Sequence, residues 1–424
     1  MMSTCVQAAP RRRSPALAIT FSTLAALGAV LPAQAQVGVQ TQAQAQPQPT
    51  SKPAAPTLAG WQFGAVIDIA QMSQALPLGL RSEGLGLGHS DLLARGSLGR
   101  HLSAEAVAGV STHEGEFERG IEKLFVQTRT LPAGLQARAG RFASQVGYLN
   151  EQHPHADDFA ERPPLYRAFL GHHYFDDGLR LNWTAPTPFF LQLGAEAFSG
   201  RKLSPEGVRR SRAGVTTITG KVGTDIGLNQ AWQAGWSVLV NRRAAPEPND
   251  HAGEIGAGLS DHAADASADA HGMDEHAHGH GARFQGRRLT MFDLAWKWAP
   301  NGNARQQQVR VVFEQARLAG LQEPSLAARR HEATSLSVVW RFRPDWEMGL
   351  RGDRLRAAIG HEDHADPVRL DEQSLMVAYK PSHRQTLRVQ WVGHRNTQGL
   401  ELPGRRTLAL QYVVAFGAHG AHNF

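Results

Sequence analysis

The residues best suited to chemistry lie between Asn249 and Gly281, where histidine and carboxylate side chains are set among alanine and glycine. Neutral imidazole and carboxylate groups are good ligands for Zn²⁺, Cu²⁺ and Ni²⁺, and the absence of thiolates argues against a closed structural zinc site. The stretch lacks an apolar periodicity that could be buried, so we expect a mobile, solvated loop that collects divalent metal ions. The alternative is a polar low-complexity insertion without a metal role. The six candidate ligands are His251, His262, His271, His276, His278 and His280.

A second set of candidate residues lies between Ser144 and Asp176, a segment with enough aromatic side chains to fold against something. If this segment narrows a channel, its polar side chains meet every solute that passes. His153 and His155 flank Pro154, where they can bind a metal ion or equally well cap the loop. The other candidates are Asp157, Asp158, Arg162 and Arg167 at the constriction, and His172, His173, His361 and His364 as metal ligands.

The N-terminal residues 1–35 have the form of a secretory signal. Three arginines precede an apolar run from Ala16 to Leu31, and Ala33-Gln34-Ala35 offers a cleavage site of small residues. Residues 36–58 are mostly Gln, Ala, Pro and Thr, which predicts a flexible periplasmic leader. Cleavage would remove Cys5, the single cysteine, so the mature chain could form no disulfide.

The charge balance gives no sign of a nucleic-acid partner. The formal net charge of +6 falls to +3 when the three signal arginines are removed. Basic residues are scattered through the chain rather than clustered with stacking aromatic residues, so we expect no nucleic-acid binding. No apolar stretch of about 18 residues follows the signal, which excludes spanning helices. A membrane role would have to come from strands.

From Trp61 onwards, segments of about ten residues alternate apolar with polar or small residues, as transmembrane β-strands do. We therefore predict an all-β fold in residues 59–424, a porin-like transmembrane antiparallel β-barrel of about 16 strands. The alternative is a soluble β-sandwich. The strands are predicted to begin near Trp61, Gly88, His101, Gly120, Gly134, Asp177, Phe189, Val215, Trp232, Arg287, Gln306, Glu332, Asp345, Leu370, Arg384 and Arg405.

Short and long connections alternate between the predicted strands. In bacterial outer-membrane barrels the short turns face the periplasm and the long loops face outward. We therefore expect the long connections, which carry most of the histidines, to lie outside the outer membrane of a Gram-negative bacterium. The predicted short turns are residues 98–101, 129–133, 184–188, 227–231, 299–305, 343–344 and 380–383.

Several motifs around the third long connection resemble a known group of proteins. They are Gly140-Arg141-Phe142, the run from Gly147 to His155, the run from Leu165 to Gly171, and Asp176-Asp177-Gly178, with a weaker match from Gly417 to Phe424. Together they resemble proteobacterial outer-membrane proteins described as zinc-regulated and often labelled TonB-dependent receptors. The resemblance implies a barrel expressed under zinc limitation and involved in zinc uptake.

The receptor label does not fit the length of the chain. A 22-stranded barrel with an N-terminal plug needs far more residues than Trp61 to Phe424 provides. The Gln-rich leader contains neither a plug nor an energy-coupling segment, so we expect no energy-coupling partner.

No catalytic signature is present, because the chain lacks G-x-S-x-G, H-E-x-x-H and a phosphate-binding glycine loop. One hydrolase arrangement would set Asp157 and Asp158 against Asp274 and His276 to activate water. A loop of glycine and alanine cannot hold a general base to the tolerance that this chemistry needs. We therefore expect no enzymatic activity.

We expect a channel through which zinc, another divalent metal or its small complex diffuses across the outer membrane after capture by the outward histidines. Its partners would be outer-membrane lipid and divalent metal ions, and the sequence leaves a homo-trimer open. One alternative is a general or anion-preferring porin, with an incidental His-rich loop and lumen-facing arginines. Another is a surface metal-binding protein without conductance. The candidate lumen arginines are Arg180, Arg310, Arg341 and Arg388.

Overall fold

A computed structural model describes residues 57–58, 60–113, 116–205, 208–209, 213–244, 282–321, 324–326, 329–361, 364–400, 402 and 404–417. The predicted signal, most of the predicted leader, and the stretch from Asn249 to Gly281 with its six histidines lie outside these residues. Residues Thr50–Phe424 form one compact unit.

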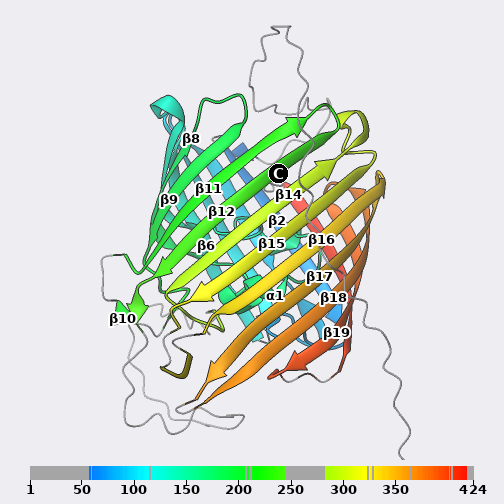
Figure 1. Cartoon of the computed structure of the whole chain (residues 1–424). Helices are drawn as coiled ribbons and strands as arrows, with labels where there is room; N and C mark the ends of the chain where they lie inside the picture. Colours follow the sequence, from blue (N-terminus) through cyan, green and yellow to red (C-terminus); the bar gives the residue numbers. More distant parts are fainter. Residues whose placement is uncertain are drawn as a thin grey trace, which may run out of the picture. The chain divides into compact units, whose positions relative to one another are not determined.

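The described part of this unit is a closed antiparallel β-barrel of sixteen strands, as predicted (Figure 1). Each strand pairs with its neighbours in sequence, and the last strand returns to the first, with Ile67 opposite Val414. The strands of the barrel are β2 (Trp61–Met72), β3 (Gly84–Leu87) continued by β4 (Ser90–Leu98), β5 (Leu102–His113), β6 (Glu116–Thr128), β7 (Leu135–Ala143), β8 (Phe175–Thr184), β9 (Phe190–Phe198), β11 (Val215–Ile226), β12 (Gln230–Asn241), β14 (Arg288–Trp298), β15 (Gln308–Ala319), β16 (His331–Arg343), β17 (Trp346–Gly360), β18 (Ala365–Ser382), β19 (Gln385–Gln398) and β20 (Arg406–Gly417).

The remaining elements are short. β1 (Thr57–Leu58) pairs with the start of β2, so the last two residues of the predicted leader are already paired. β10 (Val208–Arg209) and β13 (Arg243–Ala244) form a separate two-stranded sheet. The described helices are η1 (Pro132–Gly134), η2 (Pro154–Ala156), α1 (Pro164–Phe169), η3 (Pro300–Gly302) and η4 (Pro324–Leu326). Among the described residues, no helix is long and apolar enough to cross a membrane.

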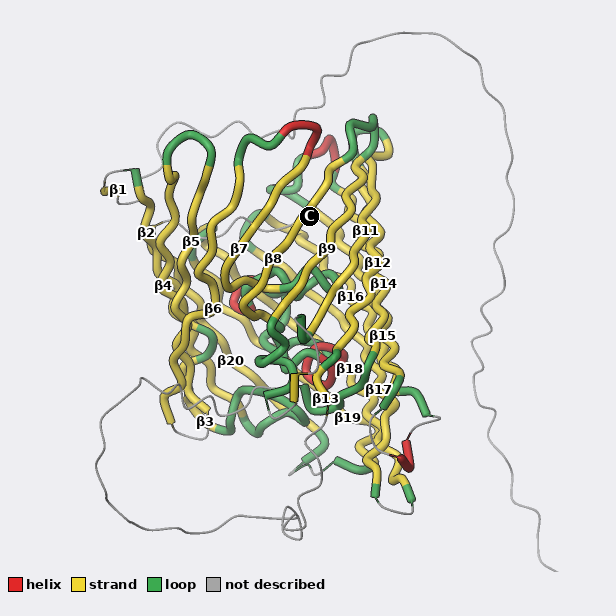
Figure 2. Tube along the Cα trace, turned by 90° about the vertical axis from the view of Figure 1, so that its left-hand side faces the viewer, coloured by secondary structure: helices red, strands yellow, loops and turns green. Residues whose placement is uncertain are grey.

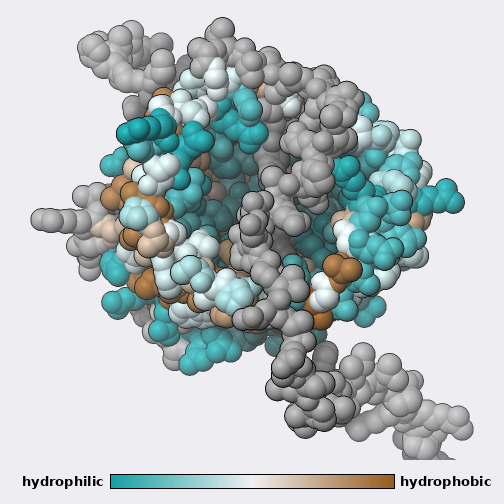
Figure 3. All heavy atoms as spheres, turned by 90° about the horizontal axis from the view of Figure 1, so that it is seen from above, coloured by the Kyte–Doolittle hydropathy of each residue, from teal (hydrophilic) through white to brown (hydrophobic). Residues whose placement is uncertain are grey.

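The alternation of side chains explains why these segments form a barrel wall. In β19, Leu387, Val389 and Trp391 are exposed, whereas Arg388 and Gln390 between them are buried. Successive side chains of a strand point to opposite faces, so the apolar set faces outward and the polar set faces the lumen. Seen from above, hydrophilic residues line the hollow of the barrel and hydrophobic residues lie on its outer wall (Figure 3).

All seven predicted short turns lie at one end of the barrel, which we call the short-turn end. At the opposite end the prediction of uniformly long connections was wrong in two places. Only residues 114–115 join β5 to β6, and only residues 361–364 join β17 to β18. The strands there extend further than their apolar pattern suggested, because β18 is 18 residues long and starts at Ala365 rather than near Leu370.

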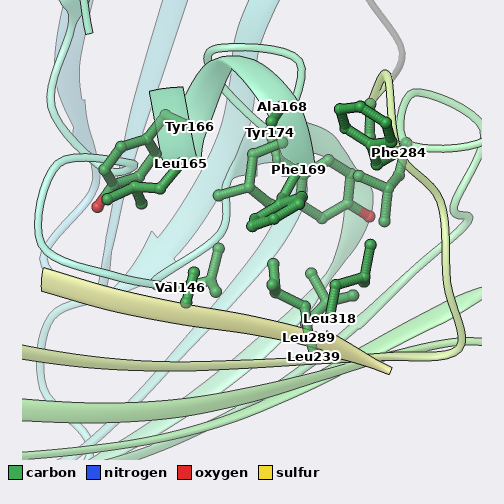
Figure 4. Packing of buried hydrophobic residues seen from close by; sticks show 14 of the residues in the cluster. Val146, Leu165, Tyr166, Ala168, Phe169, Tyr174, Leu239, Phe284, Leu289 and Leu318 are labelled. Carbon is green, nitrogen blue, oxygen red and sulfur yellow. The ribbon is translucent and has the colours of Figure 1, made fainter. Parts of the chain in front are cut away.

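The third long connection, residues 144–174, lies inside the barrel, and we call it the inner loop (Figure 2). Its side chains Leu165, Tyr166, Phe169 and Tyr174 belong to the same buried cluster as Leu239, Leu289 and Leu318 of the wall (Figure 4). Burial of this apolar surface stabilises the inward position of the loop, because each buried large side chain contributes about 1.5–3 kcal/mol. The aromatic residues of the segment are therefore what hold it inside the barrel.

Candidate metal centre

The inner loop is bound to the wall on many sides by buried polar contacts. Its first part contacts β9, where Ser144 donates a hydrogen bond of 2.5 Å to Glu196. Its middle contacts β19, where the Ala160 amide donates to Gln390 Oε1 at 2.6 Å. Its helix contacts β15, where the Tyr166 hydroxyl donates to Glu314. Contacts from so many directions fix the loop across the lumen.

The four charged residues predicted to form a constriction are engaged in these attachments. Asp157 is paired with Arg162 at 2.7 Å within the loop, and its carbonyl oxygen accepts a hydrogen bond from Arg388. Asp158 is paired with Arg310 of β15, and Arg167 with Glu372 of β18. These charges therefore position the loop, and both carboxylates of the proposed hydrolase site, Asp157 and Asp158, are engaged in ion pairs. The other half of the proposed hydrolase site, Asp274 and His276, lies outside the described residues.

Three of the four lumen arginines of the anion-porin alternative are paired with carboxylates. Arg180 is paired with Glu196 at 2.6 Å, Arg310 with Asp158, and Arg341 with Glu347 at 2.5 Å. Arg388 donates hydrogen bonds to Gln411 and to the carbonyl of Asp157. Paired guanidinium groups attract anions weakly, so Arg180, Arg310 and Arg341 do not favour an anion-selective lumen.

Histidines of the inner loop meet the wall at β4 and β6. His153 Nδ1 and His155 Nδ1 lie 2.8 and 3.1 Å from the same oxygen, Asp91 Oδ2. His89 Nε2 lies 3.2 Å from Asp91 Oδ1 and 3.1 Å from Glu122 Oε2. His173 Nδ1 approaches that Glu122 oxygen at 4.0 Å. We call these residues the histidine cluster: His89, Asp91, Glu122, His153, His155 and His173.

Two irregularities in the wall turn its members of the cluster inward. In β6, Lys123 pairs with Val107 and Ile121 with Ala108, so Glu122 is an extra residue in a β-bulge. A bulge re-aims side chains, and here Glu122 and Lys123 both lie on the lumen side of the strand. His89 lies in the similar break between β3 and β4. Gly109 opposite leaves the room that Glu122 needs, since a Cβ there would lie 2.4 Å from Glu122 Oε1.

The donor set fits a borderline divalent metal ion. Four residues, His89, Asp91, Glu122 and His153, each offer one ligand atom within 4.8 Å of the others, a group of the size that zinc uses. Two carboxylates balance the charge of one divalent ion. Among the described residues, the following buried atoms of the cluster form no hydrogen bond of regular geometry, even where an ion-pair distance joins two of them: His89 Nε2, both carboxylate oxygens of Asp91, Glu122 Oε2, Nδ1 of His153 and His155, and both ring nitrogens of His173.

The inner-loop imidazoles are held in the form that can bind metal. Burial, together with the nearby positive charge of Lys123, lowers the pKa of His153 to about 4. Burial, with Arg162 and other cationic neighbours, lowers the pKa of His173 as well. Both rings are therefore neutral at pH 7, and neutral imidazole is the metal-binding form.

The other predicted histidine ligands lie elsewhere. His172 is buried, and its Nδ1 lies 3.9 Å from Glu161 Oε2 rather than in the cluster. His361 and His364 stack at the end opposite the short turns, with ring centroids 4.7 Å apart. His361 Nε2 lies 3.3 Å from Asp366, so these three residues form a second, exposed group of candidate ligands. The six histidines of the 249–281 stretch lie beyond the described residues.

Sequence reasoning missed the wall half of the cluster. His89 and Asp91 are two residues apart, so a strand pattern could have placed them on one face. Glu122 could not be found in this way, because the bulge breaks the alternation that places every other residue in the lumen.

Comparisons with known proteins agree with the barrel geometry. The solved structures that resemble it include OmpF of Salmonella typhi in a complex with daunomycin, with a TM-score of 0.52, 9% identity, and coverage of 84% of this chain and 97% of that one. The high-pH structure of OprB of Pseudomonas putida has a TM-score of 0.51 at 10% identity, covering 85% and 94%. The trimer form of OmpT of Vibrio cholerae has a TM-score of 0.50 at 8% identity, covering 84% and 99%. The fold is that of an outer-membrane porin.

Sequence comparisons give little information beyond the porin fold. An uncharacterised protein of Aquifex aeolicus is 46% identical over 80 residues, which are 19% of this chain and 17% of that protein. The chain thus matches well under two thirds of that relative's length. No family model matches the chain.

Proposed function

We propose that this protein is an outer-membrane channel that takes up a divalent transition metal, with zinc as the expected substrate. The observation that carries the proposal is the histidine cluster, in which a loop inside the barrel meets the wall through imidazole and carboxylate groups. An ion that crosses the barrel beside the inner loop would meet these ligands. Catalysis plays no part, and removal of metal on the periplasmic side would drive the flux.

The physical chemistry of the cluster favours zinc over the more abundant hard cations. Imidazole suits Zn²⁺, Cu²⁺ and Ni²⁺, whereas Mg²⁺ and Ca²⁺ prefer oxygen ligands alone. Four imidazoles beside two carboxylates exceed what one zinc ion binds at a time. The surplus lets one ligand replace another, so an ion could be released in steps rather than trapped.

We also propose roles for the outward histidines and for assembly. His361, His364 and the six histidines between Asn249 and Gly281 would raise the local metal concentration at the entrance. The resemblance to zinc-regulated outer-membrane proteins implies expression under zinc limitation. A homo-trimer is proposed because one of the structures of similar fold, OmpT, is described as a trimer.

Zinc flux into vesicles tests the proposal. Purified protein is inserted into liposomes that contain a fluorescent zinc chelator, and the initial rates of zinc and of a neutral sugar are measured. His153→Ala with His155→Ala should change zinc flux at saturating zinc and leave sugar passage intact. His101→Ala, at the short-turn end, serves as the matched control. Equal zinc flux through all variants would identify a general porin, and zinc binding without any flux would identify a surface metal-binding protein.

A further inference from the structure

A lysine contacts the ring nitrogen of His153 that does not face Asp91. Lys123 Nζ lies 2.6 Å from His153 Nε2, while Nδ1 of the same ring faces Asp91. Lys123 Nζ also lies 3.6 Å from Glu105 Oε1 on the neighbouring strand. Because the bulge in β6 turns both Glu122 and Lys123 inward, a metal-ligand candidate and a fixed cation are adjacent in sequence and face the same site.

The contact between Lys123 and His153 decides where the ring carries its proton. A lysine ammonium has only donors, so His153 Nε2 must accept and the ring proton must be on Nδ1. In this tautomer, Nδ1 presents an N–H group to Asp91 instead of a lone pair. A metal ion that binds Nδ1 requires the proton to be on Nε2, and that N–H group cannot remain in contact with an ammonium donor.

We propose that Lys123 is a built-in competitor that lowers the metal affinity of the histidine cluster, an inference that rests on the proposed function. When metal binds, the proton of His153 moves from Nδ1 to Nε2, the bond between metal and Nδ1 forms, and Lys123 keeps its own proton and moves to Glu105. When Lys123 returns to His153, it restores the tautomer that cannot bind metal. The lysine thereby favours release.

Glu105 faces a hollow whose lining residues include none of the histidine cluster. Glu105 lines this hollow of about 370 Å³ together with Gln62, Arg95, Ser103 and other residues near the short turns. Lys123 therefore contacts the cluster on one side and a wall residue of this hollow on the other. A permeation site has to bind its ion weakly enough to let it leave. A tethered cation that competes for one ligand achieves this without the loss of the other ligands.

Metal titration of the full-length protein in detergent tests the proposal. Zn²⁺ and Co²⁺ are titrated against a competing chelator in the wild type, Lys123→Met and Lys123→Gln. Loss of a hydrogen bond to a charged group should tighten zinc binding about tenfold or more in Lys123→Met. Lys123→Gln should bind zinc at least as tightly as Lys123→Met, because the glutamine amide oxygen can accept a hydrogen bond from the Nε2–H group of His153. Lys380→Met, which removes a lysine that pairs with Glu347 away from the cluster, is the charge control.

The choice of probe ion separates a tautomer effect from simple charge repulsion. If Lys123 acts only through its charge, Lys123→Met should tighten the binding of Mg²⁺ and Zn²⁺ alike. If it acts through the tautomer of His153, Mg²⁺ binding should change far less than Zn²⁺ binding. Glu105→Gln should weaken zinc binding in the wild type and have no effect in the Lys123→Met background, since Glu105 acts only through the lysine. Equal gains for Mg²⁺ and Zn²⁺, or an equal gain in Lys380→Met, would overturn the inference.

Failure of this inference can be told from failure of the proposed function. If zinc binds equally well to the wild type and to His153→Ala with His155→Ala, the cluster is not the site and the proposed function is wrong. If those histidine variants lose zinc while both Lys123 variants bind like the wild type, the metal site stands and only the role of Lys123 is refuted.

Discussion

Asp91 Oδ2 lies 2.8 Å from His153 Nδ1, so a carboxylate of the barrel wall meets an imidazole of the inner loop at a single point. The position of Asp91 is fixed by pairing with Val66 on one side and Gly109 on the other. The position of His153 is fixed by the Pro154 turn that follows it. A metal ion bound at this point would therefore join two rigid parts of the molecule, and neither part would need to reorganise.

Asp91→Asn should weaken zinc binding and leave the barrel folded. The substitution removes one of the two negative charges that balance a divalent ion and replaces a carboxylate by a poorer ligand, while the other attachments of the inner loop remain. We expect at least about a tenfold loss of zinc affinity, consistent with the strength of charge-assisted contacts. Asp177→Asn, a carboxylate that pairs with Arg141 away from the cluster, should bind zinc like the wild type. Chelator competition measures both.

Gly109→Ala should disturb the cluster by displacing the side chain of Glu122. The new methyl group would lie 2.4 Å from Glu122 Oε1, so the carboxylate must move out of its place beside His89. Only the end of a flexible side chain has to shift, and the fold should survive. Zinc affinity should fall about as far as in Glu122→Gln. Gly352→Ala is the control, because a Cβ at that position meets nothing within 4 Å. A Gly109→Ala protein with wild-type zinc affinity would exclude Glu122 as a ligand.

The barrel could be predicted because the sequence features that indicate it are local. Alternation along each strand and the type of connection are visible in the sequence, and the sixteen predicted strands are all present in the described residues. The aromatic side chains of residues 144–174 indicated that this segment folds against a surface, and in the structure that surface is the inside of the barrel wall.

Only the residues that the inner loop contributes to the candidate site could be predicted. His153 and His155 were found because a loop segment with two histidines around a proline stands out in sequence. Glu122 and Lys123 were missed because one extra residue in β6 changes which side chains face the lumen, and a bulge has no clear sequence signal. The pairing of Asp157 with Arg162 was missed because it depends on the folded course of the loop.

Glu151→Gln should loosen the start of the inner loop and remove a pH dependence. Arg180 and Lys221 overcome the effect of burial and lower the pKa of Glu151 to about 2. The unfolded value is near 4.3, so this carboxylate contributes stability that is complete above about pH 4.5 and is lost as the pH falls towards 2. The contribution is roughly 2–3 kcal/mol. Hydrogen exchange of residues 144–151 should therefore be slow at pH 7 and faster at pH 3 in the wild type.

The Glu151→Gln variant tests the direction of this pH dependence. In Glu151→Gln, exchange of the same amides should already be faster at pH 7 and should change less between pH 7 and pH 3 than in the wild type, once the intrinsic pH dependence of exchange is corrected. Protection that is identical in the two proteins at pH 7 would mean that other contacts of the loop, such as Ser144 with Glu196, are sufficient.

Deletion of residues 249–281 should leave folding and conductance intact and weaken zinc uptake only when zinc is scarce. The strands on either side are held independently, since Val240 pairs with Arg288 and the Asn241 amide donates to the Arg287 carbonyl at 2.9 Å. The deletion has to end before Ala282, because the Phe284 amide donates to the carbonyl of Ala168 and its ring belongs to the buried cluster around α1. Loops of this kind contribute little to barrel stability.

The zinc dependence of uptake distinguishes capture from passage. In the proposed function, the outward histidines would raise the local concentration of metal, an effect that would disappear when external zinc saturates the lumen site. Ligands at the inner loop act on every ion that crosses, so His153→Ala with His155→Ala should alter flux even at saturating zinc. Uptake rates of the deletion variant, the double histidine variant and the wild type are compared from scarce to saturating zinc. If the two variants show the same dependence on zinc concentration, entrance and lumen histidines do not have separate roles, even if the barrel conducts zinc.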